Sequence, residues 1–111
     1  MKLLIIGGTG TVGASIVDYF SKEHEVIVAS RSSKKFPVDI SNSESIKSLM
    51  ENVGTCDAII CAAGEAKWGP FKSLSEEDYF IGIRSKLMGQ VNLVRIAQDY
   101  LVQNGSITLT T

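Results

Sequence analysis

The sequence predicts an α/β fold in which a doubly wound parallel sheet of about five strands has helices on both faces. Short unbroken apolar segments, typical of strands that are covered on both sides, alternate along the chain with amphipathic helical segments. Hairpin signals are scarce, so right-handed crossovers must join the strands. A length of 111 residues is about that of one domain. We therefore expect a single domain over residues 1–111 with strand order 3-2-1-4-5.

The first half of the chain supplies three of the expected strands and two helices. Residues 2–6 form a continuous apolar run that ends abruptly at glycines, which predicts a buried strand. Between residues 11 and 21 the apolar side chains recur at helical spacing, which predicts a helix with one buried stripe. The other elements expected here are strands at 26–29 and 36–40 and a helix at 45–52.

The second half continues the alternation. Residues 57–63 form another unbroken apolar strand. A long helix over residues 75–103 opens with a capping box at Ser75 and is expected to end at Asn104-Gly105. The last strand is expected at 106–110.

Composition and charge exclude several classes of partner. The 11 Lys and Arg residues nearly balance the 12 Asp and Glu residues, so we expect no binding to nucleic acid or to a membrane surface. The apolar run at the N-terminus is shorter than a signal peptide or a membrane span, which predicts a cytoplasmic protein. Cys56 and Cys61 do not have the spacing of zinc or redox motifs, so we expect buried thiols and no metal.

A glycine-rich turn joins the first strand to the first helix. It reads Gly7-Gly8-Thr9-Gly10-Thr11-Val12-Gly13. Gly7 suits a tight turn, Gly10 lets a pyrophosphate approach the backbone, and Gly13 lets the helix pack closely on the strand. The helix N-terminus then directs its free N–H groups and its positive dipole end at the phosphates. This context predicts a dinucleotide site, and the alternative is a turn whose glycines serve packing alone.

The end of the second strand indicates which dinucleotide is preferred. A carboxylate at this place would bind an adenosine ribose and repel a 2′-phosphate. The chain has Ser30-Arg31 there, followed by Lys34 and Lys35. Because a guanidinium forms strong charge-assisted hydrogen bonds with phosphate, we expect NADP(H) to be preferred, with NAD(H) possible. The alternative is that these basic side chains form only a solvated turn.

Three further segments, together with the glycine spacing, give the chain a resemblance to the short-chain dehydrogenase/reductase family. They are Val38-Asp39-Ile40, Cys61-Ala62-Ala63-Gly64 and Lys86-Leu87-Met88-Gly89. The resemblance implies a Rossmann-like fold in which Asp39 meets the adenine amino group and Ile40 lies near the ring. It also implies that the backbone of residues 62–64 runs beside the adenosine ribose. The order and spacing of the segments cover the whole chain.

The chain also departs from the family pattern. Lys86 stands where many members have an asparagine that helps to hold a proton-relay water, and Ala62 replaces a second asparagine. No tyrosine is followed four residues later by lysine, so the family's catalytic Tyr-x-x-x-Lys pair is absent and the catalytic residues are unknown, with Lys86 as the one candidate. We expect the chain to be the N-terminal, cofactor-binding part of a longer enzyme and to be inactive alone.

The resemblance implies an NADP(H)-dependent oxidoreductase that acts on a small carbonyl or alcohol substrate. Because the apolar stripe of the helix at 75–103 lacks a partner, we also expect a homo-oligomer formed through that helix. Two alternatives remain open, a non-catalytic NADP(H)-binding sensor or regulatory module, and a structural interaction domain that binds no nucleotide.

Overall fold

The apolar runs of the chain form one parallel sheet, which the computed structural model describes together with its helices over residues 1–110. Within these residues the sheet has four strands in the order β2-β1-β3-β4. The strands are β1 (Lys2–Ile6), β2 (Glu25–Ala29), β3 (Cys56–Cys61) and β4 (Leu101–Leu109). Leu4 at the centre pairs with Ile27 on one side and with Ile59 on the other. The parallel pairing confirms the predicted fold class.

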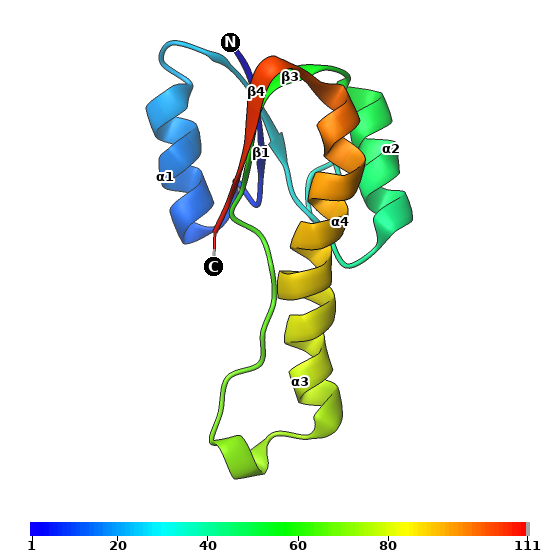
Figure 1. Cartoon of the computed structure of the whole chain (residues 1–111). Coiled ribbons are helices and arrows are strands. Elements are labelled where there is room, and N and C mark those ends of the chain that lie inside the picture. Colours follow the sequence, from blue (N-terminus) through cyan, green and yellow to red (C-terminus); the bar gives the residue numbers. More distant parts are fainter. Residues whose placement is uncertain (111) are drawn as a thin grey trace.

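Helices cover both faces of the sheet, as expected for a doubly wound fold. They are α1 (Thr11–Phe20), α2 (Ser43–Val53), α3 (Glu76–Gly82) and α4 (Met88–Ala97), with a π-helical turn at Ile83–Leu87 and 3₁₀ turns at Phe71–Ser73 and Gln98–Tyr100. α1 lies on one face, and α2 and α4 lie together on the other (Figure 1). Among the described residues, no helix is both long and apolar enough to cross a membrane.

The strand expected at 36–40 is reduced to a single parallel bridge between Ser30 and Pro37. Val38 donates its backbone N–H to the Ser30 carbonyl oxygen, whereas Pro37 has no N–H with which to extend the ladder. The bridge lies beside the end of β2, where the outermost strand of the order 3-2-1-4-5 was expected. The described part of the sheet therefore has one strand fewer than predicted.

The long helix expected at 75–103 is interrupted and ends earlier. α3 leads through the π-helical turn into α4, and the helical path ends at Tyr100. Leu101 already pairs with Cys56 in the sheet, so Asn104-Gly105 lies inside β4 and does not end the helix. Asn104 has φ 65°, and the register between β3 and β4 shifts here, so this dipeptide forms an irregularity in the strand. Leu101 packs against the core, so the last strand begins five residues before the expected residue 106.

The main hydrophobic core lies between the sheet and the pair α2 and α4. Leu4, Ile6 and Ile59 from the strands meet Ile46 from α2 and Leu93 from α4, and all five are buried. The capping of α2 fixes where it begins, because the Asn42 side chain accepts hydrogen bonds from the N–H groups of Glu44 and Ser45. This core holds the carboxyl ends of β1, β2 and β3 in a fixed relation.

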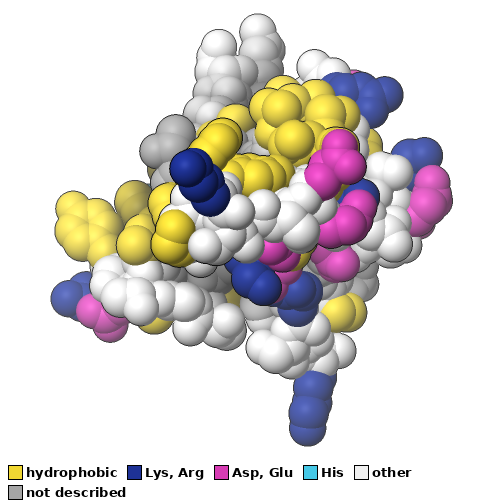
Figure 2. Space-filling view, turned by 90° about the horizontal axis from the view of Figure 1, so that it is seen from below, with side chains coloured by type: hydrophobic (Ala, Val, Ile, Leu, Met, Phe, Trp, Pro, Cys, Tyr) yellow, Lys and Arg dark blue, Asp and Glu magenta, His cyan; other side chains and the backbone are white. Residues whose placement is uncertain are grey.

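Residues 65–87, which we call the arm, project from the carboxyl-end side of the sheet (Figure 1). They lengthen the molecule to 46 Å in one direction, against 27 and 26 Å in the others. Seen from this end, the surface mixes hydrophobic, basic and acidic side chains (Figure 2). We call the remainder of the described chain, the sheet with α1, α2 and α4, the body.

Candidate functional site

A cleft of about 350 Å³ opens at the carboxyl ends of β1, β2 and β3. Its walls are formed by the turn after β1, the segment after β2 and the segment after β3, the loops at which a doubly wound sheet binds ligands. The predicted site residues that line it are Gly7, Thr9, Gly10, Ser30, Arg31, Asp39, Ile40, Ala62, Ala63 and Gly64. The structure thus brings together residues from segments that are far apart in the sequence.

The glycine turn is shaped by close backbone contacts. Gly7 has φ +84°, and a Cβ on it would lie 2.8 Å from the Ala63 nitrogen. Its N–H donates to the Ala29 carbonyl oxygen at 2.8 Å, which ties the turn to the end of β2. A Cβ on Gly10 would meet only the Gly7 carbonyl oxygen, at 3.6 Å, so the space in front of Gly10 is open. The turn is therefore not filled by its own side chains.

The N-terminus of α1 adds donors to this end of the cleft. Gly10 is the N-cap residue and provides no side chain to accept a hydrogen bond from the first turn of the helix. The dipole of the ten-residue helix places partial positive charge there. An anionic group such as a pyrophosphate fits this combination of open space and donors.

Three predicted cofactor-binding residues lie outside the cleft wall. Gly13 is buried, and a Cβ on it would lie 2.0 Å from the Gly7 carbonyl oxygen, so it allows α1 to pack on the turn. Thr11 and Val12 line a shallow apolar groove on the outer face of α1, and the Val12 side chain is exposed. The Thr11 and Val12 side chains therefore do not line the described cleft, and Gly13 has no side chain to do so. The backbone of residues 11–13 forms the first turn of α1.

Two oppositely charged groups lie on the other side of the cleft, after β2 and its bridge. The Ser41 hydroxyl donates to Asp39 Oδ1 at 2.6 Å, and this bond lowers the pKa of the Asp39 carboxyl. Arg31 Nη2 lies 2.8 Å from Glu65 Oε1, and this hydrogen bond raises the pKa of the Arg31 guanidinium. Both Asp39 and Arg31 are therefore charged at neutral pH.

Sequence reasoning missed five lining residues of the cleft, and two of them, Glu65 and Ser85, belong to the arm. Ser85 is buried in the π-helical turn, and its Oγ accepts the Glu65 N–H at 2.8 Å. Lys86, the next residue, packs its side chain on Gly64, since a Cβ on Gly64 would lie 2.7 Å from Lys86 Cδ. A five-residue π-helix has no signature in the apolar pattern, although such turns are frequent at functional sites.

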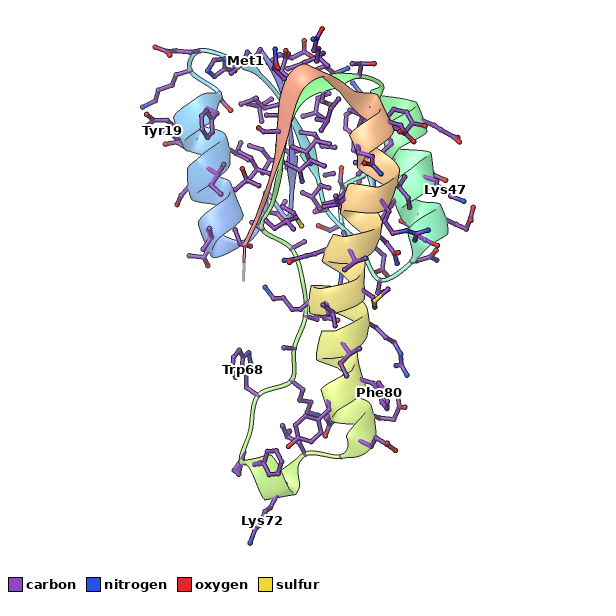
Figure 3. The ribbon with its side chains drawn as sticks, viewed as in Figure 1. Met1, Tyr19, Lys47, Trp68, Lys72 and Phe80 are labelled. Atoms are coloured by element: carbon purple, nitrogen blue, oxygen red, sulfur yellow. The ribbon has the colours of Figure 1, made fainter. Side chains whose placement is uncertain are left out.

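The two thiols of the chain are not activated as nucleophiles. Burial raises the pKa of the Cys56 and Cys61 thiols, so both are protonated and weak nucleophiles at neutral pH. In the part of the chain that the structure covers, no three His, Cys, Asp or Glu side chains are grouped to hold a metal ion. Trp68 and Phe71 are 90% and 83% exposed, and Trp68 points away from α3 and α4 on the arm (Figure 3).

Comparison with known proteins places the chain in a family. A family model described as the NAD dependent epimerase/dehydratase family matches residues 3–109. A search of curated proteins gave no match.

Solved structures similar to the chain include several dehydrogenases. The protein lin1944 from Listeria innocua is 46% identical, with a TM-score of 0.96 over all of this chain and 56% of that one. A small-chain dehydrogenase in complex with NADPH is 31% identical, with a TM-score of 0.89 over all of this chain and 50% of that one. Serine dehydrogenase from Escherichia coli, at 22% identity and a TM-score of 0.84 over 98% of this chain and 61% of that one, shares the fold. The chain spans about half the length of the first two structures.

Proposed function

The chain belongs to the NAD-dependent epimerase/dehydratase family, with short-chain dehydrogenases as its structural neighbours, and from this premise we propose that its cleft binds NADP(H). The observation that carries the proposal is the position of Arg31 in the cleft wall, across from the open glycine turn. A similar dehydrogenase, 31% identical to this chain, was solved with NADPH. The whole protein is proposed to be an oxidoreductase of a small carbonyl or alcohol compound.

Each part of the cleft fits one part of the cofactor. The open space at Gly10 and the first turn of α1 suit the pyrophosphate. Asp39 and Ile40 would lie at the adenine, the backbone of residues 62–64 at the adenosine ribose, and Arg31 at the 2′-phosphate. The bound nicotinamide would supply the hydride. The residues of this chain bind and orient the cofactor.

Binding is tested by calorimetric titration of the 111-residue chain with NADPH and NADH. We expect both to bind, NADPH more tightly. Gly10→Ala adds a methyl group in front of the phosphate site and should weaken binding about tenfold or more without unfolding the chain. Gly82→Ala is the matched control, because its Cβ meets Ala66 at an ordinary distance of 3.6 Å on the arm. Wild-type affinity in Gly10→Ala, or no heat with either nucleotide, would contradict the proposal.

A non-catalytic NADP(H)-binding module is the second candidate. It is favoured by Lys86, which stands at the family's asparagine position. Both candidates predict that this chain binds NADPH without oxidising it. They differ for the whole protein, in which NADPH oxidation with a panel of small aldehydes and ketones supports the enzyme, and binding without turnover supports the module.

Self-association is proposed through the segment 75–103, along its helical part from α3 to α4. Its support is a row of exposed apolar side chains, namely Ile83, Leu87, Met88, Val91 and Val94. Light scattering after size exclusion should show a dimer or larger species that Leu87→Glu dissociates. A wild-type monomer at all concentrations would contradict it.

A further inference from the structure

The ion pair between Arg31 and Glu65 crosses the cleft. Arg31 follows β2 and Glu65 lies beyond β3, while β1 runs between these two strands. Neighbouring strands are about 4.8 Å apart, so the two side chains reach toward one another over the carboxyl end of β1 and its glycine turn. Their charged groups meet at 2.8 Å, and both side chains line the cleft.

The position of Glu65 is set by the structure around it. Its backbone N–H is held by the Oγ of buried Ser85, and Gly64 before it has φ +142°, a conformation that favours glycine. Ser85 belongs to the π-helical turn at Ile83–Leu87, which lies directly beside Glu65. The Glu65 backbone is therefore fixed where its carboxylate can reach Arg31.

The Arg31 guanidinium already has anionic neighbours. Glu65 bonds to it directly, and the Asp39 carboxylate also acts on it through space. A guanidinium binds a carboxylate and a phosphate through the same planar set of N–H donors. A 2′-phosphate that reaches Arg31 therefore competes with the Glu65 carboxylate for the Nη2 donors.

We propose that Glu65 is a specificity-determining residue, which lowers the preference for NADP(H) over NAD(H) by competing with the 2′-phosphate for Arg31. This inference rests on the proposed function, because it needs a dinucleotide in the cleft. NAD(H) has no 2′-phosphate to hydrogen-bond with the Arg31 guanidinium, so it binds without breaking the ion pair between Arg31 and Glu65. The intact pair thus reduces the advantage of NADP(H) over NAD(H) without removing it, and opening the pair increases that advantage.

The test compares NADPH and NADH affinities of the 111-residue chain and its variants by calorimetry. Glu65→Gln keeps the size of the side chain and removes its charge. Because an exposed ion pair contributes little, we expect the ratio of NADPH to NADH affinity to rise about three- to fivefold. Glu77→Gln is the matched control, since it breaks an exposed ion pair with Arg84 on the arm and should leave the ratio unchanged.

A double-mutant cycle separates competition for Arg31 from simple repulsion between Glu65 and the phosphate. If Glu65 competes for Arg31, the effect of Glu65→Gln on the ratio of NADPH to NADH affinity depends on Arg31. The fold-change in this ratio should then be smaller, by a factor of about two or more, in an Arg31→Ala background than in the wild type. An unchanged ratio in Glu65→Gln, or an equal change in both backgrounds, overturns the inference while dinucleotide binding stands. A wild-type chain that binds neither nucleotide overturns the proposed function as well, so the two failures are distinguishable.

Discussion

The body and the arm differ in how many of their side chains are buried. The buried hydrophobic side chains of the described chain belong to the body, where strands and helices enclose them. In the arm Ser85 is the one buried residue among those described, and Trp68, Phe71 and Leu87 are exposed. The arm is held by local contacts, including the Ser75 capping box and the hydrogen bond from the Tyr79 hydroxyl to the Phe71 carbonyl oxygen.

This difference in burial matters for the proposed binding site. The residues proposed to bind the cofactor lie almost entirely at strand ends of the body, where a packed core fixes their positions. The arm borders the cleft through Glu65 and Ser85 and otherwise extends beyond it. Regions with few buried contacts open at low free energy and tolerate change. The proposed cofactor site therefore rests on the packed body, and the arm contributes only one edge of it.

The largest expected contrast is between two isoleucines. Ile59→Ala in β3 removes a fully buried side chain and should lower the free energy of unfolding by about 2–5 kcal/mol. Ile83→Ala in the arm removes a side chain that is 44% exposed and should cost less than about 1 kcal/mol. Urea denaturation followed by circular dichroism measures both. Equal losses would mean that the arm shares the stability of the body.

The fold of the body could be predicted because its signals are local. Unbroken apolar runs mark β1 and β3, and helical spacing marks α1. The glycine turn could be placed for the same reason, since its position after a buried strand is visible in seven consecutive residues. The prediction of a strand at 36–40 was wrong, because Pro37 has no N–H to donate and the ladder is limited to a single bridge.

The capping box at Ser75 was predicted, but the pair Arg31 and Glu65 and the π-helical turn of the arm could not be, because they depend on distant partners. Glu65 meets a side chain 34 residues earlier in the sequence, and no spacing rule marks such a contact. The π-helical turn that places Ser85 also leaves no trace in the apolar pattern. The early end of the last helix follows from pairing of Leu101 with Cys56, which is likewise a tertiary contact.

Alanine at two glycines should have opposite effects in the two regions. Gly13→Ala in the body places a Cβ 2.0 Å from the Gly7 carbonyl oxygen and should destabilise the chain by about 1–3 kcal/mol or more. Gly82→Ala in α3 has room for its Cβ and should stabilise the arm helix by up to about 1 kcal/mol. Thermal unfolding compares them. A tolerated Gly13→Ala would show that the turn can shift away from α1.

A smaller effect is expected from the helix cap of the arm. Ser75→Ala removes the side chain that accepts the Asp78 N–H and should cost about 1 kcal/mol of α3 stability. Hydrogen exchange should show faster exchange at residues 76–82 and unchanged exchange in β1 and β3. Asn42→Ala is the matched change at the cap of α2, and because α2 packs into the core its effect should spread through the body. Spread of the Ser75→Ala effect to β1 would remove the distinction between the regions.

The smallest expected effect is a loss of α3 stability at low pH. The Ser75 backbone N–H donates to the Asp78 carboxylate and lowers the pKa of that carboxyl below its ordinary 3.8. A pKa lowered by folding means that the stabilisation is complete above the unfolded value and is lost as the pH falls through the folded one. The protection of α3 amides, relative to the unfolded chain at the same pH, should therefore fall below about pH 4, and Asp78→Asn should abolish this loss of protection. If the loss of protection persists in Asp78→Asn, another carboxyl group, such as that of Glu77 in its ion pair with Arg84, controls the arm.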